Sequence, residues 1–311
     1  MSNQTETKFQ HNTSTNRRNV DNDDQKDIGH TLRVYLICIF VAFGGFLFGY
    51  DCVIGGPMID IPKFKLDFGT VMKNGELGFT TSTRGGFVAV MSLGTFCGAL
   101  SASQFADRLG RKWGLMTTCL VFTVGIIFQI VASKIAVLMV GRYIAGFGVG
   151  LVSVMVPLYQ AECIPAKRRG TIVSCYQLAI TIGLLIGQIV LFFTESKPGK
   201  GSYKIPIGLQ FAWSGLLAAG LIWFPETPRF LIKAGKWDQA VKAKMTLTGF
   251  KEDDPRLQEE LLEIKGNLEH EMRLGEATYA ECWRGLNLRR TLLGVFMQVW
   301  QQRIHPLINR S

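Results

Sequence analysis

Six long stretches of the sequence contain almost no charged side chains, and this segregation constrains the fold more than any other feature. They hold two of the 58 charged residues in 142 positions, whereas the remaining 169 positions hold 56. An apolar helix of about 20 residues spans the hydrocarbon core of a bilayer. The polarity does not alternate as it does in barrel strands, so the sequence predicts six transmembrane helices. The stretches are Val34–Ile59, Gly85–Ala106, Trp113–Ser133, Ile135–Ala161, Gly170–Thr194 and Ile205–Pro225.

Composition excludes several function classes. The seven cysteines and four histidines follow no zinc or redox spacing, so neither a metal nor another cofactor is expected. The net charge is +10, but acidic and basic residues number twelve each between Pro225 and Arg290, which argues against nucleic acid as a partner. No stretch presents a nucleophile beside a base, so we do not expect an enzyme. The predicted partner is the lipid bilayer.

The pattern divides the chain into four parts. Residues 1–31 are polar and predict a disordered tail, residues 32–224 the six-helix bundle, and residues 225–290 a helical segment outside the membrane. The last part, 291–311, has an apolar run of only 12 residues, Thr291–Gln302, which predicts an incomplete seventh helix of about 18 Å. Basic clusters at Arg108 to Lys112 and Lys167 to Arg169 predict that the N-terminus and the 225–290 segment are cytosolic.

Four stretches carry a pair of glycines four residues apart. Such pairs align on one helix face and allow two membrane helices to approach closely. Glycine is common in membrane helices, yet four pairs in four different helices favour packing into a bundle. The same faces would also allow a homodimer. The pairs are Gly45 and Gly49, Gly94 and Gly98, Gly146 and Gly150, and Gly183 and Gly187.

The two charged residues of the stretches are the first functional candidates. A charge inside a membrane is costly, about 3 kcal/mol at mid-helix on insertion scales, and it is functional by default. Asp51 and Arg142 have opposite signs, so a pair facing a water-filled cavity is the economical arrangement. Two alternatives remain: Asp51 at a helix end in contact with water, and Arg142 snorkelling to the interface.

Several motifs, in this order and spacing, resemble the N-terminal half of a sugar porter of the major facilitator superfamily, of the fungal hexose-carrier type. The resemblance runs from about residue 34 to 302. It implies an all-α polytopic membrane protein: a six-helix major facilitator half-bundle with short intracellular helices and a stub of helix 7. The motifs are Gly44–Asp51, Ala106–Lys112, Gly141–Arg142, Pro157–Glu162, Arg168–Gly170, Gln177–Thr181, Pro225–Phe230 and Gln301–Gln302.

The resemblance implies roles for particular residues. Gln177, Gln301 and Gln302 would hydrogen-bond a sugar, whose hydroxyls both donate and accept, with Phe48 and Ile180 in the same cavity. Asp51 and Arg142 are the proton-coupling candidates, although fungal-type facilitators can retain the acid, so coupling does not follow. Six charged residues would form an inner gate, or would alternatively be ordinary positive-inside loop charges: Asp107, Arg111, Glu162, Arg169, Glu226 and Arg229.

Two departures from the family matter. The family commonly has Trp-Arg where this chain has Tyr203-Lys204. After Gln302 the family motif is replaced by Arg303-Ile304-His305-Pro306, and the chain ends at Ser311, so only the N-terminal half is expected. The resemblance implies hexose or monosaccharide transport, facilitated or proton-coupled, by alternating access in the plasma membrane. The alternative is a non-transporting sugar sensor or an inactive, regulatory fragment.

Overall fold

The computed structural model confirms the six predicted spans. It describes residues 33–71, 77–164, 169–197, 199–273, 281, 283 and 285–308. The predicted tail, 1–31, lies outside the described residues, as do Lys167, Arg168 and Cys282. Helices long and apolar enough to cross a membrane are Arg33–Asp60 (the first helix), Thr81–Leu109 (α3), Arg111–Val131 (α4), Ile135–Cys163 (α5), Arg169–Glu195 (α6) and Gly201–Trp223 (α7).

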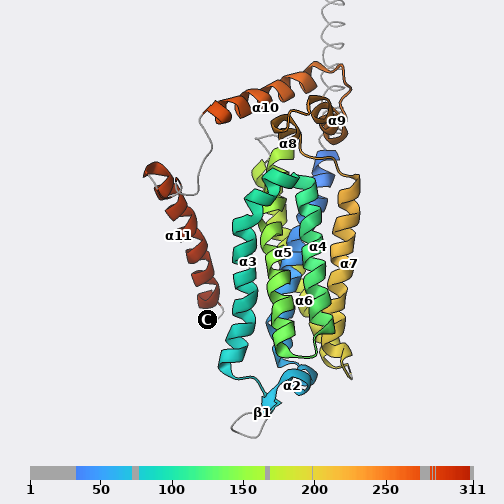
Figure 1. The fold of residues 1–311 in the computed structure, drawn as a ribbon, viewed down its shortest axis with the longest axis vertical. Coiled ribbons are helices and arrows are strands. Elements are labelled where there is room, and N and C mark those ends of the chain that lie inside the picture. Colours follow the sequence, from blue (N-terminus) through green and yellow to red (C-terminus); the bar gives the residue numbers. More distant parts are fainter. Residues whose placement is uncertain are drawn as a thin grey trace, which may run out of the picture. The chain divides into compact units, whose positions relative to one another are not determined.

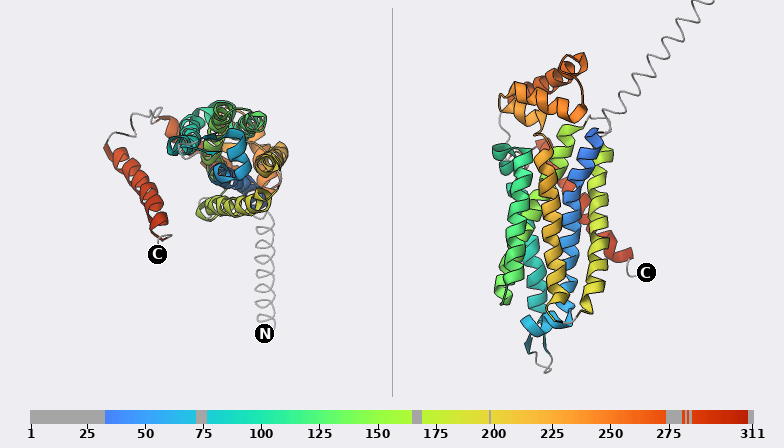
Figure 2. Two further views of the ribbon diagram at one scale, coloured as in Figure 1. Left: turned by 90° about the horizontal axis from the view of Figure 1, so that it is seen from below. Right: turned by 90° about the vertical axis from the view of Figure 1, so that its right-hand side faces the viewer.

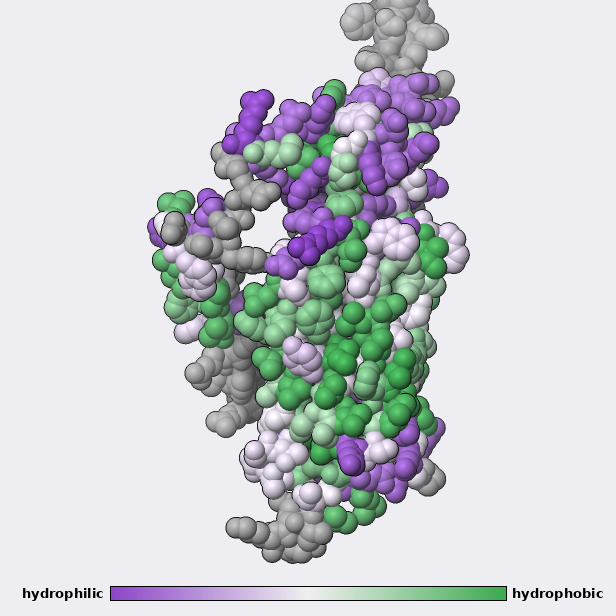
Figure 3. Space-filling model, in the orientation of Figure 1, coloured by the Kyte–Doolittle hydropathy of each residue, from purple (hydrophilic) through white to green (hydrophobic). Residues whose placement is uncertain are grey.

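The six helices stand side by side as one bundle (Figure 1), with the first helix, in blue, between α6 and α7 (Figure 2). Hydrophobic side chains cover the middle of the bundle, and hydrophilic ones gather at the end that carries α8 (Pro228–Lys233) and α9 (Trp237–Thr248) (Figure 3). We call this end proximal. The opposite end is called distal.

Glycine pairs join the helices in two reciprocal crossings. Gly45 and Gly49 of the first helix lie against the backbone of α6. In return, Gly183 of α6 lies against the backbone of the first helix, and Gly187 lies against Val53. In the same way, Gly94 and Gly98 of α3 lie against α5, whose Gly146 and Gly150 lie against α3. A methyl group at any of these glycines except Gly187 would approach opposing backbone atoms too closely. All four predicted faces are therefore used inside the bundle, and none is left for the homodimer that they were expected to allow.

The distal end carries short elements that the sequence did not predict. The first helix closes in a 3-10 turn, η1 (Pro57–Asp60), followed by α2 (Pro62–Phe68). Two short antiparallel strands follow, β1 (Thr70–Val71) and β2 (Leu77–Gly78), with Thr70 paired with Gly78. Thr80 caps α3, since its hydroxyl accepts a hydrogen bond from the amide of Thr83.

The segment predicted to be helical, 225–290, contains α9 and α10 (Pro255–Arg273). Gly249 ends α9 in the left-handed conformation at φ 77°. Leu247 of α9 and Leu257 and Leu261 of α10 are fully buried, and Lys244 Nζ lies 2.6 Å from Glu260 Oε2. The chain forms two compact units that divide between Leu261 and Leu262, so the last helix belongs to a separate unit.

The last helix, α11 (Gly285–Ile308), is longer than predicted. It has 24 residues, whereas the apolar run that predicted it has only 12, and it continues through Pro306. The predicted helix was too short because the length of an apolar run indicates how much of a segment suits lipid, and not where a helix begins and ends. Arginine and leucine, which flank the run, are good helix formers. Among the described helices, α11 is not one of the six apolar enough to span a membrane.

Candidate functional site

Asp51 and Arg142 form an ion pair inside the bundle. Arg142 Nη1 of α5 lies 3.2 Å from Asp51 Oδ1 of the first helix, and the two side chains are 2% and 0% exposed. Neither residue therefore reaches water from a helix end. Removing one partner of such a pair leaves an uncompensated buried charge, at a cost of about 3–5 kcal/mol.

Packing surrounds the guanidinium of Arg142. Its Nη2 donates to Met91 Sδ at 2.8 Å, and its Cζ lies 5.2 Å from the ring centroid of Phe87, both on α3. A cation over a ring face is attracted by the ring quadrupole. Gly55 closes the site from the first helix, because a methyl group there would overlap Nη2.

Gln210 of α7 completes this site, and sequence analysis did not single it out. Its Nε2 donates to Asp51 Oδ1 at 3.0 Å, and the residue is fully buried. Among the described residues, Asp51 Oδ2, Gln210 Oε1 and Arg142 Nε have no hydrogen-bond partner. The available signal in the sequence was an amide within an uncharged stretch. We call Asp51, Arg142 and Gln210 the distal site.

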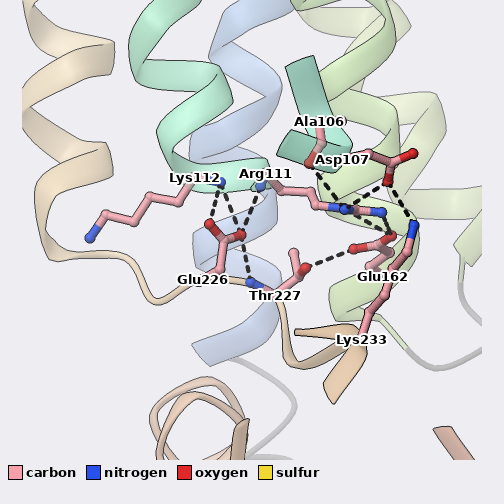
Figure 4. A network of polar contacts seen from close by, with 8 residues as sticks. All are labelled: Ala106, Asp107, Arg111, Lys112, Glu162, Glu226, Thr227 and Lys233. Carbon is pink, nitrogen blue, oxygen red and sulfur yellow. Dashed lines mark hydrogen bonds and ion pairs between the residues drawn. The ribbon is translucent and has the colours of Figure 1, made fainter. Parts of the chain in front are cut away.

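A second polar cluster, the proximal network, joins α3, α4, α5 and α8 at the other end of the bundle (Figure 4). Arg111 Nη2 and Nε donate to Glu162 Oε1 at 2.9 and 3.1 Å, and Nη1 donates to the carbonyl of Ala106. Arg111 is only 6% exposed. Asp107 Oδ1 lies 3.5 Å from Arg111 and 3.2 Å from Lys233 Nζ, at the exposed margin of the network.

Glu226 links the end of α7 to the start of α4. Its carboxylate accepts hydrogen bonds from the backbone amides of Arg111 (2.9 Å) and Lys112 (3.0 and 3.1 Å). These are the first amides of α4, so a negative charge there also complements the helix dipole. Thr227 donates to Glu162 Oε2 at 2.7 Å, a link that sequence analysis missed.

The structure thus brings together four of the six predicted gate residues: Asp107, Arg111, Glu162 and Glu226. Arg169 is exposed at the start of α6, and in the described part of the chain no ion pair joins it to these four. Arg229 is half-buried as the second residue of α8.

The predicted sugar contacts lie on the first helix, on α6 and on α11. Gln177 is exposed on α6, Ile180 is buried one turn further along α6, and Phe48 is half-buried on the first helix. Gln301 and Gln302 lie on α11, in the other unit, and their side chains lie outside the described residues. Among the described residues, no three histidine, cysteine or acidic side chains are placed to hold a metal ion.

The sequence is similar to a transporter family and to individual fungal proteins. A family model described as "Sugar (and other) transporter" matches residues 37–304. The high glucose sensor RGT2 of Saccharomyces cerevisiae is 42% identical over 273 residues, covering 86% of this chain and 35% of the sensor. The probable glucose transporter rco-3 of Neurospora crassa is 40% identical over 278 residues, covering 88% of this chain and 47% of the transporter. The chain thus spans at most about half the length of these relatives.

The fold also matches a solved structure. The proton:xylose symporter XylE, bound to 6-bromo-6-deoxy-D-glucose, superposes with a TM-score of 0.68 over 80% of this chain and 55% of that chain. The sequence identity is 24%, so this likeness concerns the fold alone. The expected fold class, a six-helix major facilitator half-bundle, is confirmed.

Proposed function

We propose, because the chain belongs to the sugar (and other) transporter family, that it forms the N-terminal half of a carrier for a hexose or a related monosaccharide. The family match over residues 37–304 carries the proposal, since it extends over all six spans. The chain is an integral membrane protein of a transporter family rather than an enzyme. We place it in the plasma membrane with the proximal end in the cytosol, because Arg108, Arg111 and Lys112 gather there.

In this proposal Gln177 binds the sugar. Its exposed amide both donates and accepts hydrogen bonds, as sugar hydroxyls require, and Phe48 supplies an apolar surface on the first helix. Ile180 lies one turn further along α6 and is buried, so in this proposal it supports that part of α6 rather than touching the sugar. Roles for Gln301 and Gln302 rest on the family resemblance.

The proximal network acts as the cytosolic gate. Carriers of this fold alternate by moving two six-helix halves about a central site. Most contacts of the network are single ion pairs or hydrogen bonds near the bundle end, and exposed pairs such as Asp107 with Lys233 contribute only about 0–1 kcal/mol each. Such a network can break and form again during each cycle.

The distal site offers a place for a proton. Asp51 Oδ1 accepts hydrogen bonds from both Arg142 and Gln210, whereas no described residue binds Oδ2. A proton on Oδ2 would neutralise the carboxylate without displacing either donor, and it would weaken the attraction for Arg142. Proton-coupled transport would use this step, and facilitated transport would leave the pair intact.

The test is uptake by a fusion of this chain to the C-terminal half of the Neurospora crassa relative, in cells without hexose carriers. We expect saturable hexose uptake by the fusion, and none by the 311-residue chain expressed alone, which contains six of the required spans. Gln177→Ala should lower uptake at least tenfold, as expected for loss of buried polar contacts with the sugar. Gln104→Ala, which alters an exposed amide on α3, is the control.

A correctly inserted fusion that takes up no hexose would contradict transport and favour the second candidate, a sugar sensor. The 42% identity to the high glucose sensor supports that candidate. It predicts a hexose-dependent signal without uptake, which a transcriptional reporter in the same cells would detect. We do not propose a homodimer, because its expected glycine faces are used within the bundle.

A further inference from the structure

Short elements close the distal end of the bundle directly after the first helix. Phe64 of α2 is fully buried, and Asp60 of η1 forms ion pairs with Lys65 (3.5 Å) and with Arg84 of α3. We call η1 and α2 the distal cap (Figure 1, bottom). Its contacts with α3 and α7 hold it against the ends of the spanning helices.

Tyr203 of α7 connects to the cap through its hydroxyl. The hydroxyl donates to Asp67 Oδ2 of α2 at 2.8 Å, and Lys63 Nζ lies 3.0 Å from Asp67 Oδ1. The Tyr203 ring lies 5.5 Å from that of Phe64, nearly perpendicular to it. Tyr203 is 2% exposed.

A continuous series of contacts runs from the cap to the buried ion pair. The Phe64 and Phe87 rings lie 6.3 Å apart in edge-to-face geometry, and the Arg142 guanidinium lies over Phe87 at 5.2 Å. Both phenylalanines are fully buried. Movement of Phe64 would therefore free space beside Phe87, the ring on which Arg142 rests.

Hydrogen bonds alone hold Arg142 weakly. A guanidinium has five N–H donors. In the described structure one reaches Asp51, one reaches the weak acceptor sulfur of Met91, and Nε reaches none. The position of the guanidinium thus depends on packing against Phe87 and Gly55.

We propose that the distal cap positions Arg142: the Tyr203–Asp67 hydrogen bond seats Phe64, Phe64 supports Phe87, and Phe87 holds the guanidinium against Asp51. Tyr203, Phe64 and Phe87 are positioning residues that act through Arg142. The inference goes beyond the proposed transport, since it applies equally to a facilitator, a symporter or a sensor.

The test measures whether Asp51 is charged, and it needs no transport. Dicyclohexylcarbodiimide enters membranes and adds to protonated carboxyl groups, leaving an N-acylurea that peptide mass spectrometry locates. In the 311-residue chain in nanodiscs, Asp51 paired with Arg142 should react slowly. Tyr203→Phe should raise the labelling of Asp51 about fivefold. A hydrogen bond to a charged group changes an equilibrium about tenfold or more, and only part of that effect should reach Asp51. Arg142→Met should raise it most.

Matched controls separate this effect from general loosening. Tyr159→Phe removes a tyrosine hydrogen bond to the carbonyl of Pro225 at the proximal end and should leave Asp51 labelling unchanged. Glu162, a buried carboxylate of the proximal network, should stay unlabelled in Tyr203→Phe. Asp67→Asn, which keeps an acceptor for Tyr203, should fall between wild type and Tyr203→Phe.

The proposal would be overturned if Asp51 were labelled in Tyr203→Phe only as much as in the wild type. It would also be overturned if labelling rose as much at Glu162 as at Asp51. Phe87→Leu provides a second route to the same answer if Tyr203→Phe does not insert, because it removes the ring beneath Arg142. Unchanged Asp51 labelling in that variant would also overturn the proposal.

Discussion

The distal site and the proximal network both centre on an arginine and a carboxylate, but different forces hold the two arginines. Arg111 donates through Nε, Nη1 and Nη2 to a carboxylate and a backbone carbonyl, and its own amide is bound by Glu226. Arg142 has one carboxylate oxygen and a sulfur. Packing against Phe87 and Gly55 supplies the rest.

This difference affects how each site can change. The proximal network distributes its energy over several hydrogen bonds and ion pairs, so single contacts can be lost while the others remain. The distal site has one charge pair in a dry environment, where an unpaired charge is not tolerated. A switch at the proximal end can therefore be gradual, whereas the distal pair is either formed or neutralised.

The largest expected effect is that of Arg142→Met, which leaves the charge of Asp51 buried in the bundle without its partner. We expect a loss of about 3–5 kcal/mol, seen as a lower melting temperature in detergent. Arg111→Met should cost less, because Thr227 still donates a hydrogen bond to Glu162 Oε2. Adding Asp51→Asn to Arg142→Met should recover most of the loss. Equal losses at the two arginines would mean that the same forces hold both side chains.

The next effect tests packing at the distal site through Gly55→Ala. Its new methyl group would overlap Arg142 Nη2, and overpacking of this kind costs about 1–3 kcal/mol. Gly56→Ala is the matched control, because its methyl group would meet only the carbonyl oxygen of Cys52, at 4.0 Å. Thermal unfolding of both variants measures the difference. If the two melt alike, the guanidinium is not held by Gly55.

A smaller effect is expected from Glu226→Ala in the proximal network. The substitution removes the acceptor for the first amides of α4, and loss of such a cap costs about 1 kcal/mol. Glu226→Gln retains one acceptor oxygen and should lose less. Glu252→Ala, an exposed carboxylate beyond α9, serves as the control in the same melting experiment. If Glu226→Ala lowered the free energy of unfolding by several kcal/mol, the stabilisation would depend mainly on Glu226 and would not be shared among the contacts of the network.

The smallest expected effect is the pH dependence of the distal cap. Partial desolvation raises the pKa of Asp67, but hydrogen bonds from Lys63 and Tyr203 and the charges of Lys63 and Lys200 lower it, and the net pKa lies below its usual value. A carboxyl with a depressed pKa in the folded state stabilises that state above its unfolded pKa. This contribution is lost as the pH falls through the folded pKa.

The cap should therefore stay seated at mildly acidic pH and loosen only below about pH 4. Amide hydrogen exchange of α2 measures the loosening. Asp67→Asn should flatten this pH dependence, and a loosening near pH 6 would contradict the assignment to Asp67.

Much of the membrane region was predictable from sequence because the requirement of lipid for uncharged helices is local. The positions of charges along the chain were enough to predict the six stretches and the pair of Asp51 and Arg142. The glycine pairs indicated close packing, but not which helices would meet or that every face would be occupied within the bundle. Gln210, Thr227 and Tyr203 were missed as site members because amides, hydroxyls and phenols are unremarkable in sequence.

The sequence by itself determined the six spans and the two intramembrane charges, since hydrophobicity and charge act residue by residue. The residues of the proximal network were expected only from the family resemblance. Only the tertiary structure decided which groups satisfy those charges. Gln210 and Asp51 are 159 positions apart and Tyr203 and Asp67 136 apart, and helix packing alone brings them within hydrogen-bond distance. Partner choice in a buried site depends on geometry over a few ångströms, and no local pattern in the chain carries that information.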